Sequence, residues 1–493
     1  MEYWLGLDCG GTFIKAGLYD RHGNECGIVR RGLEIIAPQP GWAERDMSAL
    51  WHTAADVIRE LLTTRRVAGA AIQAVGISAQ GKGLFLLDKQ GQPLGNGILS
   101  SDQRALALVR EWQQQGIPQA LYPLTRQTLW TGHPVSLLRW IKQHQPARYA
   151  QIGTVQMAHD YLRYCLTGEL ACEETNSSES NLYHMTRGGW DPLLAQQLGI
   201  GEIVPALPPL IGSAEVAGRI HPAAAALTGL QVGTPVVGGL FDVVSTALCA
   251  GLDDETRLNA VMGTWSVTSG ITDRLCDDPD YPFVYGRYAE PGRWIVHEAS
   301  PTSAANLEWF CQQWGLRDYA QLNAWVAALP RAASSLLFVP FLYGSNAGLG
   351  LHAGFFGLQA CHQRAHLVQA IYEGVIFSHL THLHRMRQRF PQATALRITG
   401  GPAHSRVWMQ MFADISGLPV ELPQVEETGC LGAAMAAMVG SGAYTHFAAA
   451  QRAMASRLIR LTPDADVAVP CRKKYQRYQS LIAVLQALQS EEE

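Results

Sequence analysis

The sequence predicts an α/β protein made of two large domains, and three observations support this expectation. The chain has 493 residues, whereas a single domain usually contains about 100 to 200 residues. Short apolar runs typical of strands alternate with helical patterns along the chain, as in layered α/β folds. A glycine loop between two short strands occurs once in each half, which indicates two related modules.

The composition excludes several classes of protein. Hydrophobic residues make up 47% of the chain and charged residues 16%, so the chain can bury sizeable cores. The formal net charge of −4 provides no basic field that would hold nucleic acid. The ten cysteines include no C-x-x-C pair, which argues against a disulfide framework or a zinc cluster. No apolar run reaches the length of about 18 residues that a membrane span needs. We therefore expect a cytoplasmic protein that binds neither nucleic acid nor membranes.

Residues 1–245 are expected to form the first domain. Two apolar runs flank the segment Cys9-Gly10-Gly11-Thr12 and predict a β-hairpin that opens a sheet. Apolar residues at helical spacing predict a helix over residues 47–62. The polar stretch 173–180 and the proline-rich stretch 205–209 are interpreted as loops within this domain. Strands are expected at residues 3–8, 13–19, 71–78 and 84–87.

Residues 246–493 are expected to form the second domain, because the strand and helix pattern restarts after residue 230. Two strands flanking Gly263-Thr264 resemble the first hairpin, with Thr264 in the position of Thr12. We place the boundary near residue 245. The elements expected after residue 230 are strands at 234–240, 258–262 and 267–271 and helices at 243–249 and 473–490.

Asp8, Gly10, Gly11 and Thr12 form a candidate phosphate loop. Glycines lack side chains, so backbone N–H groups can approach an anion, and the Thr12 hydroxyl adds a donor. An ordinary Gly-Gly hairpin is the alternative.

Two further glycine loops favour a nucleotide site over that alternative. Gly263-Thr264 supplies a second loop, and a triphosphate held between two domains needs two loops. Gly400-Gly401 follows a strand expected at 395–398 and could admit the adenosine end of a nucleotide.

Asp242 follows a buried strand close to the expected domain boundary. A carboxylate in this position can cap the following helix or act as a catalytic base, and both roles can hold at once. Phosphoryl transfer to a hydroxyl needs a base within hydrogen-bond reach of that hydroxyl. Asp242 is therefore the candidate general base.

Two longer segments resemble the signatures of the FGGY carbohydrate kinases, and the resemblance covers nearly the whole chain. The first segment runs from Gly132-His133-Pro134 to His144, although Leu137 stands where the family usually has lysine. The second comprises 353–358, His366-Leu367 and 370–373, and it follows the family pattern throughout. The resemblance implies two actin-like, ribonuclease-H-like ATPase domains with a cleft between them. It also implies transfer of the γ-phosphoryl group of ATP to a sugar.

The same resemblance implies roles for individual residues. Asp8 corresponds to the residue that holds Mg2+ through water, and Asp242 corresponds to the general base. The residues assigned to nucleotide binding in this way are Gly10, Gly11, Thr12, Gly263, Thr264, Ala304, Gly400, Gly401 and Ser405. Ala304 stands where the family has a nucleotide-contacting glycine, and Val243 stands where it usually has glutamine after the base.

The loop Gln80-Gly81-Lys82 corresponds to the family segment that enters the sugar pocket. A buried cation without a counter-charge is costly, so Lys82 would suit a substrate carboxylate better than a neutral polyol. The alternatives are that Lys82 reaches solvent or pairs with Asp88. Asp102, Arg104 and His133 are further candidates for the sugar pocket, together with Asp242.

Within the family, these motifs are most similar to kinases of L-xylulose and 3-keto-L-gulonate. The resemblance therefore implies phosphorylation of a primary hydroxyl on a ketose or keto-sugar acid. Glycerol and D-xylulose are alternative substrates. An actin-like ATPase without sugar kinase activity is the alternative of a different class. The expected partners are ATP and a small sugar, and the sequence leaves open whether the chain forms a homodimer.

Overall fold

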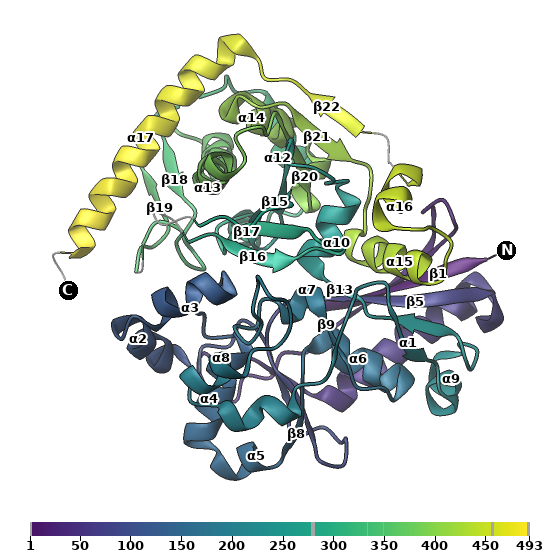
Figure 1. The fold of residues 1–493 in the computed structure, drawn as a ribbon. Helices are drawn as coiled ribbons and strands as arrows, with labels where there is room; N and C mark the ends of the chain where they lie inside the picture. Colours follow the sequence, from purple (N-terminus) through teal and green to yellow (C-terminus); the bar gives the residue numbers. More distant parts are fainter. Residues whose placement is uncertain (1, 278–281, 333, 349, 455–457, 491–493) are drawn as a thin grey trace. The chain divides into compact units, whose positions relative to one another are not determined.

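The computed structural model of the chain describes residues 2–277, 282–332, 334–348, 350–454 and 458–490. It divides into two compact α/β units, each of which consists of three segments that are not contiguous in the chain (Figure 1). Unit 1 comprises Met1–Asp253, Thr272–Val296 and Glu427–Ala455, and unit 2 comprises Asp254–Ile271, His297–Glu426 and Ser456–Glu493. The predicted α/β class with two large domains is confirmed. The boundary near residue 245 stays a prediction, because the units interleave along the chain.

Unit 1 is built on a mixed sheet in which β1 and β5 lie at the centre. Its strands run in the order β11-β12-β5-β1-β2-β3, and β13 also pairs with β5. The hairpin of β1 and β2 is antiparallel, as the two apolar runs predicted, whereas β1 and β5 are parallel. The strands are β1 (Tyr3–Cys9), β2 (Phe13–Tyr19), β3 (Glu25–Gly32), β5 (Ile72–Ala79), β11 (Val216–Arg219), β12 (Pro235–Val237) and β13 (Leu240–Phe241).

Helix α15 (Thr428–Gly440) packs directly on β1 and β5 because two glycines remove the side chains between them. A Cβ at Gly6 would lie 1.9 Å from the carbonyl oxygen of Cys430, and one at Gly76 would lie 2.0 Å from that of Ala433. This close approach brings the start of α15 to the end of β1. Helices α10 (Asp242–Cys249) and α16 (Phe447–Ala453) pack beside α15. Helices α1 (Met47–Arg65), α6 (Ala158–Thr167) and α9 (Pro222–Thr228) pack on the other face of the sheet, in one core with Leu5, Leu7 and Cys9.

Residues of the segment between β5 and β12 form a second apolar core in unit 1. The polar stretch 173–180, predicted to be a loop, instead forms β9 (Cys172–Glu173) and α7 (Glu174–Ser177) and is buried almost throughout. Its polar groups satisfy one another, since the Glu173 carboxylate accepts from the backbone N–H of Thr175 at 2.9 Å. The remaining elements are β4 (Glu44–Arg45), β6 (Phe85–Asp88), β7 (Gly97–Ile98), β8 (Ile152–Gln156), β10 (Leu210–Ile211), α2 (Leu106–Gln114), α3 (Ile117–Thr125), α4 (Pro134–His144), α5 (Pro146–Ala150) and α8 (Pro192–Gln197).

Unit 2 repeats the central arrangement of unit 1. Strands β14 (Arg257–Met262) and β15 (Ser266–Thr272) form an antiparallel hairpin, and β14 is parallel to β20 (Ala395–Thr399). The relation of β14 to its two neighbours therefore matches that of β1 to β2 and β5. The sheet continues through β17 (Trp294–Ser300) on one side and β21 (Val420–Pro423) and β22 (Leu458–Leu461) on the other.

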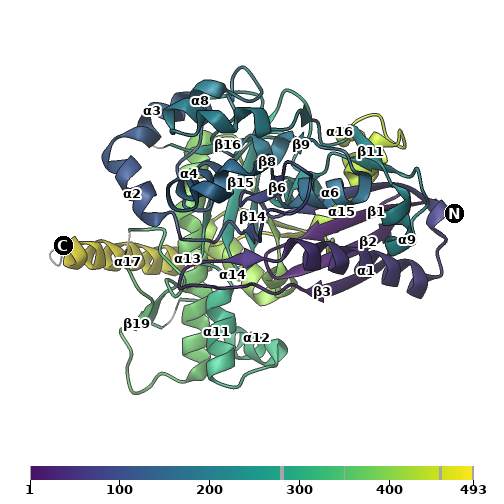
Figure 2. The same cartoon turned by 90° about the horizontal axis from the view of Figure 1, so that it is seen from below.

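Long helices cover the sheet of unit 2 (Figure 2). The predicted C-terminal helix is confirmed as α17, although it begins at Ala465 rather than Lys473. It packs on α13 and α14 through buried aromatic side chains, among them Tyr475 and Tyr478. The helices are α11 (Ala305–Gln313), α12 (Tyr319–Ala327), α13 (Arg364–Arg389), α14 (Arg406–Ser416) and α17 (Ala465–Ser490), and a small sheet joins β18 (Leu337–Val339) to β19 (Gly354–Phe356).

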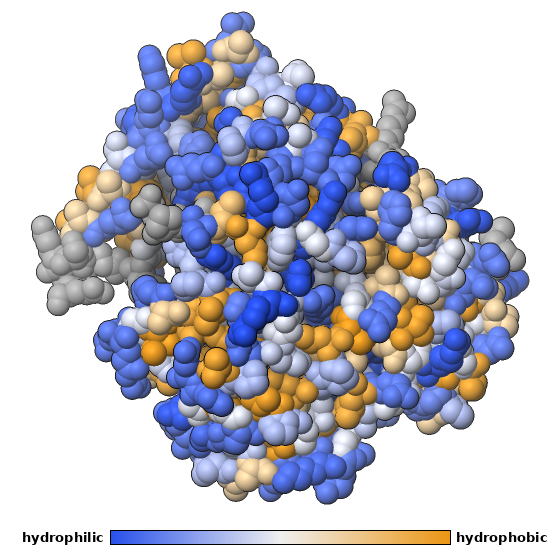
Figure 3. Space-filling model, in the orientation of Figure 1, coloured by the Kyte–Doolittle hydropathy of each residue, from blue (hydrophilic) through white to orange (hydrophobic). Residues whose placement is uncertain are grey.

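Two expectations about composition can be compared with the structure. All ten cysteines are free, as the absence of paired spacing predicted. Among the described residues, no helix has the length and apolar character to cross a membrane. Hydrophilic and hydrophobic residues are interspersed over the face shown in Figure 3. The cytoplasmic location stays a prediction.

Candidate active site

Two carboxylates stand at the same end of the unit 1 sheet, on either side of β5. Asp8 pairs in register with Ser78 from β1, and Leu240 pairs with Ser78 from β13. Asp242 follows β13 directly and opens helix α10. Because both strands run parallel to β5, their carboxyl ends meet at one edge, where ligands usually bind in open α/β sheets.

Burial raises the pKa of both carboxyl groups. The pKa of Asp242 rises to about 7, first because of burial and second because of the negative charge of Asp8. The pKa of Asp8 rises to about 6 through burial, although the Lys15 ammonium acts in the opposite direction. A carboxyl group with a pKa near neutrality can take up and release a proton at physiological pH, as a general base must.

The first glycine loop connects β1 to β2 and leaves Thr12 exposed. The N–H of Gly10 donates to the carbonyl of Phe13 at 2.9 Å, which closes the turn. Arg45, from the short strand β4, is buried and donates to the carbonyl of Gly11 at 2.5 Å. The Arg45 guanidinium therefore places a positive charge next to the glycine loop. The sequence pattern did not indicate this contact.

The region around Asp8 suits a hard cation that keeps most of its water. Mg²⁺ is usually bound by one or two carboxylates together with substrate phosphates. Among the described residues, no group of three or more histidine, cysteine, aspartate or glutamate side chains could hold a metal ion. A divalent cation would still stabilise the charged forms of the two half-buried carboxyl groups, whose pKa values are raised, so Asp8 fits such a role through water.

Lys82 has a counter-charge within the fold, and this differs from what the sequence suggested. Its ammonium forms an ion pair with the buried Glu179 carboxylate and lies 5.1 Å from the ring centroid of Phe241. The alternative partner Asp88 accepts instead from backbone N–H groups of the turn that follows it. The premise that Lys82 lacks a counter-charge without a substrate carboxylate is therefore wrong.

The neighbours of Lys82 fix the position of its loop. A Cβ at Gly81 would lie 2.3 Å from the ring of Phe241, so only glycine fits there. The side chain of Gln80 comes within 3.6 Å of where a Cβ of Gly11 would stand. The structure therefore brings Gln80, Gly81 and Lys82 to the same edge as the phosphate loop and Asp242.

His133 is buried at the start of α4, and its surroundings keep it neutral. Its Nδ1 accepts from the backbone N–H of Trp130 at 3.0 Å and lies 3.1 Å from the amide of Asn181. Burial and the positive charge of Lys82 lower the pKa of His133 to about 3. Because Nδ1 accepts, the neutral imidazole carries its proton on Nε2, and this N–H can donate to a sugar hydroxyl.

Asp102 and Arg104 form a buried ion pair. The guanidinium of Arg104 donates to Asp102 at 2.9 Å and to Glu44 at 2.6 Å, and it lies 3.9 Å from the ring centroid of Trp42. Asp102 also accepts from the backbone N–H of Ala43 at 2.7 Å. Most of their donors and acceptors are thus used within the protein, which favours a bracing role over direct sugar contact.

The other predicted nucleotide residues lie in unit 2 and form a second group. Thr264 is exposed in the turn between β14 and β15, and the N–H of Ala304 donates to the carbonyl of Gly263 at 3.0 Å. Gly400 has a φ of 100° and would place a Cβ 2.3 Å from the carbonyl oxygen of Met262. These contacts bring Gly263, Ala304 and Gly400 together around the end of β14.

Gly401 and Ser405 follow the same strand end. A Cβ at Gly401 would meet no atom within 4 Å, so this position is open. Ser405 caps α14 by accepting from the N–H of Trp408 at 3.1 Å, and its hydroxyl donates to Asn323 at 2.6 Å. A structural role for Ser405 is therefore established, whereas its contact with adenosine stays a prediction.

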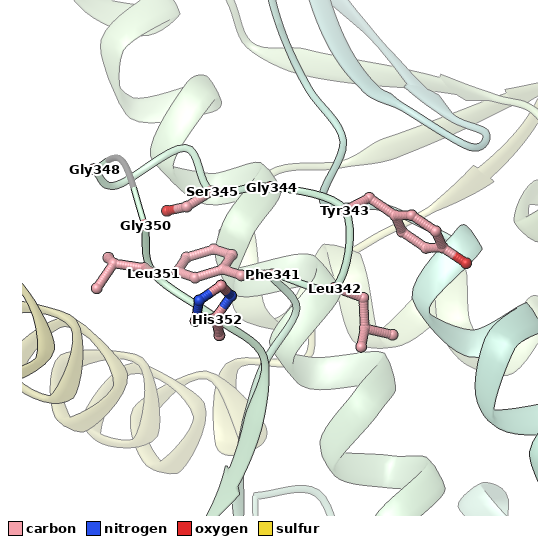
Figure 4. Close-up of a pocket in the computed structure, with 9 residues that line it drawn as sticks. All are labelled: Phe341, Leu342, Tyr343, Gly344, Ser345, Gly348, Gly350, Leu351 and His352. Carbon is pink, nitrogen blue, oxygen red and sulfur yellow. The ribbon is translucent and has the colours of Figure 1, made fainter. Parts of the chain in front are cut away.

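A separate hollow of about 310 Å³ in unit 2 lies beside the segment that connects β18 to β19 (Figure 4). The side chains of Phe341, Leu351 and His352 lie close together in its wall. Asn346, in the same segment, donates to the carbonyl of Ser378 at 3.1 Å. This hollow contains none of the predicted nucleotide-binding residues.

Models of a known protein family match both halves of the chain. The N-terminal domain of the FGGY family of carbohydrate kinases matches residues 3–249, and its C-terminal domain matches residues 258–441. The chain belongs to the FGGY family of carbohydrate kinases. It is therefore an ATP-dependent carbohydrate kinase, as the signature segments predicted.

Individual relatives cover almost the whole FGGY chain. It is 65% identical to the L-xylulose/3-keto-L-gulonate kinase of Escherichia coli strain K12, over 98% of this chain and 97% of the relative. It is 60% identical to a probable L-xylulose kinase of Pasteurella multocida, over 99% and 100% of the two chains. Among solved structures, xylulose kinase from Rhodospirillum rubrum matches with a TM-score of 0.87 and 27% identity, over 99% of both chains.

Sequence reasoning missed several residues of this FGGY site. Arg45 and Glu179 carry charges into it from segments far away in sequence, and neither belongs to a recognisable motif. Gly429 contacts the Asp8 side chain from helix α15, more than four hundred residues later. The high density of polar residues in 173–180 was the available signal, and the sequence pattern predicted a loop there.

Proposed function

We propose that this kinase transfers the γ-phosphoryl group of ATP to a primary hydroxyl of L-xylulose or 3-keto-L-gulonate. The names of the two relatives at 60% identity or more support these substrates. Glycerol and D-xylulose remain weaker alternatives, since the loop Gly81-Lys82 differs from the residues that kinases of those substrates carry. An actin-like ATPase without a sugar substrate is set aside, because both family models belong to carbohydrate kinases.

The observation that carries the mechanism is the position of Asp242 next to Asp8 at one edge of the sheet. Asp242 would accept the proton of the attacking hydroxyl, and its pKa of about 7 suits that role. By taking this proton, ionised Asp242 becomes protonated and makes the hydroxyl oxygen a better nucleophile toward the γ-phosphorus.

Asp8 would hold Mg²⁺ through water, and the cation would neutralise charge on the phosphates of ATP. The glycine loops around Thr12 and Thr264 would each offer backbone N–H groups and a hydroxyl to the phosphates. Gly263, Ala304, Gly400 and Gly401 would support the nucleotide from unit 2. Gln80, His133 and the Lys82–Glu179 pair would orient the sugar, and Asp102–Arg104 would brace its pocket.

A coupled assay of ADP release tests the proposal. The wild-type enzyme with Mg²⁺ and ATP is assayed against L-xylulose, 3-keto-L-gulonate, D-xylulose and glycerol, and without sugar. We expect the highest kcat/KM with one of the first two substrates and little ADP release without sugar. A higher kcat/KM for D-xylulose or glycerol would overturn the substrate assignment, and sugar-independent ADP release would overturn the kinase mechanism.

A further inference from the structure

Lys82 and Glu179 form an ion pair at the edge of the unit 1 sheet where Asp242 lies. The side chain of Glu179 is fully buried, and that of Lys82 is 18% exposed. The ammonium of Lys82 lies over the ring of Phe241, which directly precedes Asp242. An electrostatic influence of both residues on Asp242 follows from this proximity.

The backbone holds Lys82 in a conformation that is unfavourable for a residue with a side chain. Its φ is 61°, in the left-handed region, and its N–H donates to the side-chain oxygen of Asn176 at 2.9 Å. Asn176 and Glu179 belong to the same buried polar segment, so this segment fixes both ends of Lys82. Such strain is retained where the surrounding structure determines the position of a functional group.

The single positive charge of Lys82 is already paired with a carboxylate. Lys82 faces Glu179, and both residues act electrostatically on Asp242. A substrate carboxylate bound at Lys82 would have to share one ammonium with Glu179. Two carboxylates beside one cation repel each other, and the repulsion is strong where water is excluded.

A neutral polyol meets no such repulsion. The partly exposed ammonium of Lys82 retains N–H groups that can donate to a sugar hydroxyl. Hydrogen bonds to charged partners are stronger than those between neutral groups. Lys82 therefore offers a donor to a substrate without charge, while its ion pair with the buried Glu179 stays intact.

We propose that Glu179 is a specificity-determining residue that favours a neutral ketose, L-xylulose, over a keto-sugar acid. This inference rests on the proposed function, because it assumes that the sugar binds at the Lys82 loop. Glu179 acts in two ways: it occupies the cation that an acid would need, and it repels the carboxylate of the acid.

The test compares kcat/KM for 3-keto-L-gulonate and for L-xylulose at saturating Mg²⁺ and ATP. Glu179→Gln keeps the size of the side chain and frees the charge of Lys82. We expect this variant to raise the ratio of acid to neutral kcat/KM by about tenfold or more. The matched control is Glu174→Gln in the same segment, whose carboxylate instead contacts Tyr183 and Arg287. The control should leave the ratio unchanged.

A measurement on the wild-type enzyme covers the case in which Glu179→Gln does not fold. Salt would screen an attraction of the acid by the partly exposed Lys82, so the inference expects an acid-to-neutral ratio that does not fall with ionic strength. A ratio that falls with ionic strength would mean that Lys82 attracts the acid, and it would overturn the inference. An unchanged ratio in a folded Glu179→Gln variant would also overturn it while leaving the proposed function intact. If neither L-xylulose nor 3-keto-L-gulonate stimulates ADP release, the proposed function and this inference are both overturned.

Discussion

The Cγ of Asp8 lies 2.2 Å from the point where a Cβ of Gly429 would stand. Gly429 belongs to the first turn of α15, and the glycines of β1 and β5 allow this helix to press against the sheet. The position of Asp8 therefore depends on the absence of a side chain on a helix that follows much later in the chain.

We expect Gly429→Ala to reduce kcat/KM by about a hundredfold. The added methyl group must displace the Asp8 carboxylate, and a shift of about 1 Å at a catalytic group commonly costs that much. The same assay with Gly32→Ala is the control, because a Cβ at Gly32 meets no atom within 4 Å. A Gly429→Ala enzyme with wild-type activity and an unchanged dependence on Mg²⁺ concentration would argue against a role of Asp8 in holding the cation.

Asp242→Asn should fold normally and bind ATP but lose most sugar phosphorylation. Removal of a general base commonly lowers the rate by about 10²- to 10⁴-fold. The folded-state pKa of about 7 lies above the ordinary value of 3.8, so Asp242 lowers the stability progressively as the pH rises from about 3.8 to 7, and the full loss is present above pH 7. The variant should therefore unfold at the same temperature as the wild type or higher at pH 8. Thermal unfolding and steady-state kinetics check both statements, and near wild-type kcat would remove Asp242 from the mechanism.

The pH profile of kcat/KM should fall on the acidic side, with an apparent pKa near 7. The base must be ionised, so activity rises as the pH increases through the pKa of Asp242, which burial and Asp8 raise. The charge of Lys82 lowers this pKa, whereas that of Glu179 raises it. Lys82→Met should therefore move the acidic limb to higher pH, and Glu179→Gln should move it to lower pH. Shifts in the opposite directions would contradict this electrostatic account.

His379 is expected to position the second phosphate loop in unit 2. Its Nδ1 lies 2.8 Å from the hydroxyl of Ser266, which follows Gly263-Thr264-Trp265, and its Nε2 lies 3.0 Å from the hydroxyl of Ser303, next to Ala304. Burial lowers the pKa of His379 to about 3, so the ring stays neutral and can donate on one side and accept on the other.

His379→Asn removes one of these two links and should raise KM for ATP by about tenfold, with a smaller change in KM for the sugar. His384→Asn, on an exposed face of the same helix, is the control. Equal effects of His379→Asn on both KM values would indicate a general loss of structure rather than positioning of the loop.

The local sequence was sufficient to predict the two hairpins and the glycine loops that they carry. Residues 3–19 and 257–272 contain alternating apolar runs around glycine, and these patterns determine strand pairing over a few residues. The helix after Asp242 was also predictable from apolar residues at helical spacing, whereas the expected capping role of Asp242 was wrong, because Phe241 is the N-cap of α10 and no side chain caps it. Membership of the carbohydrate kinases followed from long motifs that chance rarely supplies.

Which residues come together in the candidate site was decided by the tertiary structure. Arg45, Glu179 and Gly429 come from segments that no local pattern connects with Asp8, Lys82 or Asp242. The stretch 173–181 looks like a solvated loop, because burial of polar residues cannot be recognised until their partners are known. Lys82 shows the reason most directly: its charge is visible in the sequence, but its function depends on whether a counter-charge lies beside it, and Glu179 reaches it only through the packing of the fold.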